Sequence, residues 1–199
     1  MVRAKGNTNV KKALPNSSGG YQSEDGKAET PMVCFVGVSG SGKTTLLEIV
    51  VKGLKSEGYR VATIKHCHDD FDIDRPGKDS WRLAQAGSDI IAVSSPHRVA
   101  VIEHVDAEPA LSQFETLFRG KVDIILVEGN KNSRVPKIVV LNHQQTQEPL
   151  RYSGEILATI TPSYSSSGVP QFDPDDIDCI MKLLIGRIPF KQVCSSVSA

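Results

Sequence analysis

The 199-residue chain lacks several features that define whole classes of protein. Lys plus Arg and Asp plus Glu number 23 each, so there is no excess positive charge to attract nucleic acid or an acidic membrane surface. No apolar run approaches the ~18 residues of a spanning helix, and the N-terminus has no apolar signal-peptide core. The sequence predicts a cytoplasmic protein with a small-molecule or protein partner, and with no nucleic acid and no membrane partner.

Cysteine and aromatic residues are also scarce. The four cysteines, at positions 34, 67, 179 and 194, lie far apart and form no Cys-x-x-Cys pair. This spacing argues against a thiolate zinc site and gives no disulfide framework. The single tryptophan, Trp81, is expected to pack rather than to stack on a base. The hydrophobic fraction of 39% is ordinary for a globular protein, so we expect the chain to fold.

The chain divides by composition into a polar leader and an apolar-patterned remainder. Residues 1–30 have no periodic apolar face and predict a disordered leader. An organellar transit peptide is the alternative, but Glu24, Asp25 and Glu29 count against it because such peptides are poor in acids. We predict one nucleotide-binding domain at 31–188 and a flexible tail at 189–199.

Short apolar runs alternate with helical stretches from Met32 onward. This pattern is typical of βαβ units and predicts an α/β fold with a mostly parallel sheet flanked by helices. Gly58 is placed to end the first helix in the left-handed conformation, and the run at 122–129 is apolar enough for a central strand. Strands are predicted at 32–37, 60–65, 89–95, 122–129, 136–141 and 155–160, and helices at 44–58, 79–87 and 173–186.

The strongest motif lies between the first predicted strand and helix. Residues 37–44, GVSGSGKT, match the phosphate-binding loop G-x-x-x-x-G-K-[ST] without a gap. In such a P-loop the backbone N–H groups surround phosphate, Lys43 reaches the β- and γ-phosphates, and Thr44 offers its hydroxyl to Mg²⁺. A Gly/Ser-rich surface turn is the alternative. The predicted nucleotide-binding residues are Gly37, Ser39, Gly40, Ser41, Gly42, Lys43, Thr44 and Thr45, and the expected ligand is a purine nucleoside triphosphate with a divalent metal.

A P-loop needs a second metal-side group at the end of a neighbouring strand. Glu128 ends the run VDIILVE, and we predict that it acts on the metal side, either through water or by orienting an attacking water. Its alternative role is to cap the loop beginning at Gly129. Asp123 begins the same strand, at the wrong end for the site, and is expected to be structural.

The segment 65–80, KHCHDDFDIDRPGKDS, follows another predicted strand and should open onto the same edge of the sheet. Its histidines and acids would suit a metal site or a switch. A run of this kind is more often a solvated loop, and both interpretations stay open.

Several segments taken together resemble the MobB family of molybdopterin-guanine dinucleotide biosynthesis adaptor proteins. The resemblance runs from about Met32 to Leu184 and includes the segments 37–66, 68–89, 123–131, 135–139 and 171–178. The P-loop alone is shared by many families. Lys65-His66, the later His68, and Asp74 followed by the sequence Pro-Gly-Lys-Asp-Ser at 76–80 are far more specific.

This resemblance implies a GTP-binding P-loop protein, usually a homodimer, that assists the guanylyltransferase MobA in attaching GMP to molybdopterin during molybdenum cofactor biosynthesis. It implies at most a slow GTPase. Residues 37–45 would then bind phosphate and Mg²⁺, with Lys43 and Glu128 as the candidate catalytic residues and Thr44 and Glu128 on the metal. His66, His68 and Asp74 match the family's pattern and receive no firm role.

Guanine specificity rests on the resemblance alone. Residues 130–133, Asn-Lys-Asn-Ser, lack the acid of the N-K-x-D motif by which many GTPases recognise guanine. The alternative function is a small-molecule kinase that uses ATP and binds its acceptor with the 66–79 loop. Arg98 and Arg119 are isolated, so no Arg-rich lid of the kind such kinases use is evident. A nucleotide-free scaffold is a third interpretation, which the intact Lys43 and Thr44 disfavour.

Overall fold

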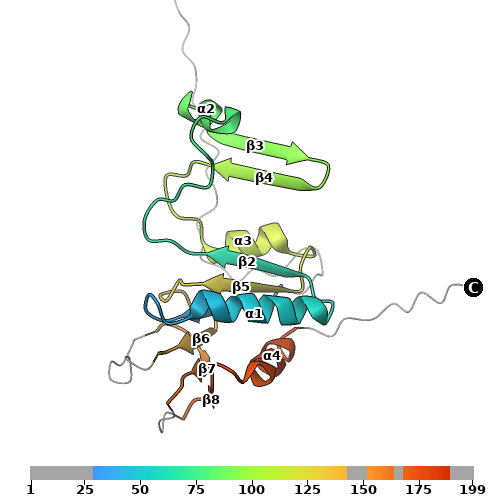
Figure 1. Ribbon diagram of the computed structural model, residues 1–199, viewed down its shortest axis with the longest axis vertical. Coiled ribbons are helices and arrows are strands. Elements are labelled where there is room, and N and C mark those ends of the chain that lie inside the picture. Colours follow the sequence, from blue (N-terminus) through green and yellow to red (C-terminus); the bar gives the residue numbers. More distant parts are fainter. Residues whose placement is uncertain (1–28, 143–151, 164–167, 189–199) are drawn as a thin grey trace, which may run out of the picture.

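A computed structural model describes residues 29–142, 152–163 and 168–188. Its main feature is a six-stranded sheet in the order β2-β5-β1-β6-β7-β8, in which every adjacent pair is parallel (Figure 1). The predicted mostly parallel α/β fold is therefore confirmed. The strands are β1 (Met32–Val36), β2 (Val61–Lys65), β5 (Ile124–Glu128), β6 (Lys137–Val140), β7 (Ile156–Ile160) and β8 (Gln171–Phe172).

Helices cover both faces of this sheet. Successive side chains of a strand point to opposite faces, so an apolar strand needs a partner on each face. Val33 and Phe35 of β1 pack with α1 (Lys43–Ser56) and α4 (Ile177–Ile185) on one face. Cys34 and Val36 pack toward α3 (Leu111–Phe118) on the other. All five residues of β5 are buried, which confirms the prediction of a central strand in this segment.

Helix α1 ends as its sequence predicts. Gly58 has a φ of +80°, and its N–H and that of Tyr59 bond to carbonyls in the last turn of the helix. Gly53, inside the helix, lies against Met181 of α4, where a Cβ would meet the thioether sulfur at 3.0 Å. The small residue therefore lets two helices on the same face approach closely.

One part of the chain stands apart from the main sheet. Helix α2 (Asp79–Gln85) precedes β3 (Ile90–Ser95), which pairs antiparallel with β4 (Arg98–Glu103) in a two-stranded sheet of its own. We call residues 79–103 the hairpin arm; Figure 1 shows it at the opposite end of the long axis from β8. The predicted strand at 89–95 is present, but outside the parallel sheet, and the sequence did not predict β4, α3 or β8.

The predicted tail, and the predicted leader apart from residues 29 and 30, lie outside the described residues. The division into leader, domain and tail stays a prediction. Within the described part of the chain, no helix is long and apolar enough to cross a membrane.

Candidate phosphate-binding site

The segment 37–42 joins the end of β1 to the start of α1, as the motif requires. Gly40 and Gly42 have φ values of +75° and +90°, and a Cβ at either position would meet no atom within 4 Å. Glycine is thus needed here for the turn of the backbone, which leaves room for a ligand to approach the N–H groups. At Gly37 a Cβ would overlap the Val140 carbonyl oxygen, so the loop starts directly against the end of β6.

The remaining predicted P-loop residues lie around the first turn of α1. Ser39, Thr44 and Thr45 are exposed and Ser41 is buried. The Lys43 ammonium donates to the Val38 carbonyl oxygen at 2.6 Å and to Ser41 Oγ at 3.5 Å. Burial lowers the pKa of Lys43, while the Glu128 carboxylate acts in the opposite direction and the Lys65 ammonium adds to the lowering. Lys43 therefore lies within electrostatic range of both side chains.

Glu128 lies beside the P-loop, on the same face of the sheet as α1. It pairs in register with Phe35 of β1 and points to the face that packs on α1. Thr44 Oγ1 donates a hydrogen bond to Glu128 Oε2 at 3.0 Å, and Glu128 is only 8% exposed. The structure thus brings together the two residues that the sequence assigned to the metal side.

Lys65 also contacts this carboxylate and was not among the predicted site residues. It ends β2, pairs in register with Glu128, and forms an ion pair through Nζ with Glu128 Oε1. The contact depends on β2 and β5 being neighbours, which the sequence did not determine. Its position at the end of a strand that precedes a polar loop is the signal that could have identified it.

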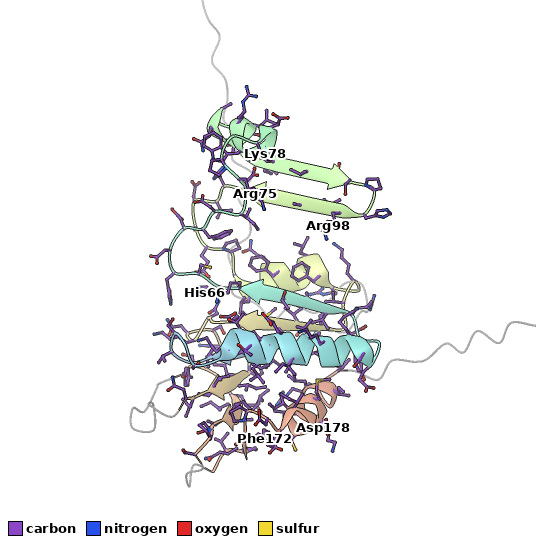
Figure 2. All side chains as sticks on the ribbon, in the orientation of Figure 1. His66, Arg75, Lys78, Arg98, Phe172 and Asp178 are labelled. Carbon is purple, nitrogen blue, oxygen red and sulfur yellow. The ribbon has the colours of Figure 1, made fainter. Side chains whose placement is uncertain are left out.

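The next residue, His66, points to the opposite face of the sheet. Its ring Nε2 pairs at 2.9 Å with Oε1 of Glu108, a residue in the connection between β4 and α3. Its backbone N–H donates to the backbone carbonyl of Glu128 at 3.0 Å. Figure 2 shows His66 at the end of β2, with Arg75 and Lys78 farther along, toward the hairpin arm. His66 therefore connects the P-loop edge of the sheet to the segment that leaves the arm.

The polar loop that contains His66 does not assemble a metal site. The rings of His66 and His68 are edge to face with centroids 5.0 Å apart, and Asp74 Oδ1 accepts from the Arg75 N–H at 2.8 Å. Across residues 29–142, 152–163 and 168–188, no three His, Cys, Asp or Glu residues are grouped so that they could hold a metal ion. The loop therefore gives no support to the metal interpretation.

Asp123 lies at the other end of β5. Its carboxylate accepts from the Arg60 N–H at 2.7 Å and pairs with the Arg60 guanidinium at 2.7 Å. This arrangement fixes the start of β5 against β2, which is the structural role the sequence predicted for Asp123.

Taken together, the carboxyl edge of the sheet presents a lysine, a hydroxyl and a carboxylate beside a turn of backbone N–H groups. Such N–H groups at a helix N-terminus favour phosphate. A hydroxyl and a carboxylate are oxygen ligands, the kind that Mg²⁺ prefers. The residues present therefore fit a metal-bound nucleoside triphosphate.

Comparison with known proteins identifies the family. The family described as "MobB: Molybdopterin guanine dinucleotide synthesis protein B" matches residues 32–162. A Haemophilus influenzae protein named molybdopterin-guanine dinucleotide biosynthesis adapter protein is 35% identical over 162 residues, which cover 81% of this chain and 85% of that protein. The Escherichia coli protein of the same name is 38% identical over 130 residues, covering 62% and 73% respectively.

A solved structure of similar fold agrees with this result. The crystal structure named molybdopterin-guanine biosynthesis protein B superposes with a TM-score of 0.65 and 27% identity, covering 78% of this chain and 97% of the other. The matched family region begins with β1 and includes the P-loop, Lys65 and Glu128. The chain therefore belongs to the MobB family.

Proposed function

We propose that this protein is a GTP- and Mg²⁺-binding accessory protein in the biosynthesis of molybdopterin-guanine dinucleotide, the nucleotide form of the molybdenum cofactor. The observation that carries the proposal is the hydrogen bond between Thr44 and Glu128 beside an intact P-loop, within a MobB fold. The relatives' names describe them as adapter proteins of this pathway. An adapter requires a partner enzyme, and we propose a guanylyltransferase of the MobA type.

The proposed ligand contacts follow from the site. The backbone N–H groups of residues 37–45 and the Lys43 ammonium would bind the phosphates. Thr44 and Glu128 would hold Mg²⁺, which neutralises phosphate charge when it is bound. Guanine preference is supported only by the relatives' name, since the dinucleotide named there contains guanine.

We propose that hydrolysis of the nucleotide is slow. Fast phosphoryl transfer needs cationic groups that stabilise charge in the transition state, such as an arginine finger. Among the described residues, the cation that contacts the P-loop is Lys43 and the cation that pairs with Glu128 is Lys65. This arrangement favours binding over rapid turnover.

We also propose a homodimer. The hairpin arm is a two-stranded sheet that, in the described residues, pairs with no other strand, and such a hairpin has little stability by itself. It exposes Ile90, Val99 and Val101 at 55%, 71% and 61%. Apolar groups gathered on one strand pair favour burial against another chain.

The central experiment is a titration with GTP and with ATP, both with Mg²⁺, of the wild type and a Lys43→Ala variant. We expect binding that favours GTP, and a loss of about a hundredfold or more in Lys43→Ala because a charge-assisted phosphate contact is removed. Lys52→Ala, at an exposed lysine of the same helix, is the matched control and should bind like the wild type.

The second part of the test is co-purification with a MobA-type guanylyltransferase. Preference for ATP together with no retention of such a partner would overturn the proposed function. Transfer of phosphate from ATP to an added acceptor, faster than hydrolysis, would instead support the kinase alternative.

A further inference from the structure

The Glu128 carboxylate is shared between two partners from different elements. Oε2 accepts from the Thr44 hydroxyl of α1, and Oε1 is paired with the Lys65 ammonium of β2. The Glu128 side chain is 10% exposed, whereas that of Lys65 is 60% exposed. A carboxylate this buried is costly without a charged or hydrogen-bonding partner. Lys65 therefore supplies the countercharge from the solvent side.

The sheet itself places Lys65 there. Both residues end their strands, and they are directly paired in the register of β2 and β5. In adjacent strands, paired residues project their side chains to the same face, which here is the face covered by α1. The contact is thus built from two rigid strands and does not depend on the conformation of the following loop.

Two lysines lie near this carboxylate. Lys65 pairs with Glu128 Oε1, and Lys43 directly precedes Thr44, whose hydroxyl donates to Oε2. A divalent cation beside Thr44 would be attracted by the same carboxylate that Lys65 already pairs with, and it would be repelled by the Lys65 ammonium at short range. Lys65 and the metal would therefore compete for the Glu128 carboxylate.

We infer that Lys65 controls cation binding at this site: its ammonium pairs with Glu128 and competes with the divalent cation for that carboxylate. The inference rests on the proposed binding of a nucleotide with Mg²⁺. Lys65 thereby sets the Mg²⁺ concentration at which the site fills, while Lys43 and the loop backbone bind the phosphates. This role differs from that of a phosphate-binding lysine, and the two roles predict different measurements.

The first experiment measures the Mg²⁺ concentration that gives half-maximal binding of the nucleotide preferred by the wild type. In Lys65→Met we expect this concentration to fall about fivefold, because the competing cation is gone and a partly exposed ion pair is worth about 1 kcal/mol, or fivefold. Lys65→Arg should stay close to the wild type. Lys52→Met, which removes the same charge from an exposed position of α1, should also leave it unchanged.

Two outcomes would overturn the inference. One is an unchanged or higher Mg²⁺ midpoint in Lys65→Met. The other is a loss of nucleotide affinity at saturating Mg²⁺ with the midpoint unmoved, which would place the Lys65 ammonium on the phosphates instead.

The second experiment needs no nucleotide and separates this inference from the proposed function. Thermal unfolding is measured for Lys65→Met, Glu128→Gln and the double variant in metal-free buffer. We expect the double variant to lose clearly less stability than the sum of the single losses, since each single change leaves a partner unpaired. Additive losses would show that Lys65 does not hold Glu128. If the wild type bound neither GTP nor ATP, the proposed function would fail, and this cycle would still decide whether Lys65 and Glu128 are energetically coupled.

Discussion

Lys137 brings an ammonium group into the interior, on the face of the sheet opposite the P-loop helix. It is fully buried, and its Nζ donates to the Ser133 carbonyl at 2.6 Å, to Ser133 Oγ at 3.2 Å and to the Val135 carbonyl at 2.8 Å. Burial lowers the pKa of this ammonium. The loop that it ties down follows Glu128 and opens with left-handed residues, Gly129 and Asn130, at φ +95° and +56°.

We expect Lys137→Met to lower the free energy of unfolding by about 2 kcal/mol, because the loop loses three hydrogen bonds from a buried ammonium to partly buried acceptors. The measurement is chemical denaturation at neutral pH. Lys131→Met, in the same loop but exposed, removes an equal charge and should cost less than about 0.5 kcal/mol. Equal losses in the two variants would mean that the ammonium does not hold the loop.

Helix α3 is attached to the sheet by a polar contact as well as by its apolar side chains. Its Glu115 carboxylate accepts at 2.9 Å from the backbone N–H of Thr30, which lies just before β1. Glu115 is also paired with Arg119, one turn later in the helix. The Arg119 hydrogen bond, with a smaller contribution from Thr30, outweighs burial and lowers the pKa of Glu115 from its ordinary value of 4.5. The ionised form of Glu115 is thus favoured by the fold.

This shift fixes the direction of a pH dependence. Because the folded-state pKa is lower than the unfolded one, the stabilisation is fully present above about pH 4.5 and is lost as the pH falls through the folded-state value. At pH 7 we expect Glu115→Gln to be about 1 kcal/mol less stable than the wild type, and the difference should shrink steadily below pH 4.5. Glu48→Gln, on the exposed side of α1, should show no such trend in denaturation measured at each pH.

The whole molecule combines a buried parallel sheet with an exposed antiparallel arm. Ile90, Val99 and Val101 lie on one face of the hairpin. Residues two apart in a strand share a face, as do residues paired across the two strands. The pairs on this face are Ile90 with Glu103, Ala92 with Val101, and Ser94 with Val99. Ile91 on the opposite face is buried, on the strand that contacts α2. The arm thus leaves the face of Ile90, Val99 and Val101 open to a second copy.

If this face forms the proposed homodimer, the double variant Val99→Asp/Val101→Asp should be monomeric, because two carboxylates cannot be buried without partners. Light scattering coupled to size exclusion measures the mass. Leu117→Asp, which introduces the same side chain at an exposed position of α3, should remain dimeric. A monomeric wild type, or a dimer that persists in the double variant, would contradict the assignment of the interface.

Local patterns in the sequence predicted the elements that carry the P-loop, because an unbroken motif between an apolar strand and an amphipathic helix needs no distant information. They did not predict β8, a two-residue strand that exists through its pairing with β7. They also missed β4, although RVAVIE is apolar at most positions, and α3. Lys65 was not predicted as a site residue for a different reason. It contacts Glu128 because β2 and β5 are neighbours in the sheet, and local sequence does not determine strand order.

The end of β2 makes ion pairs on both faces of the sheet. Lys65 contacts Glu128 on one face of the sheet, and the very next residue, His66, contacts Glu108 on the other. One peptide bond therefore separates the residue that contacts the proposed metal-binding carboxylate from the residue that contacts the segment returning from the arm. A displacement of this strand end would disturb both ion pairs together, so the P-loop carboxylate and the connection between β4 and α3 are coupled through two consecutive residues.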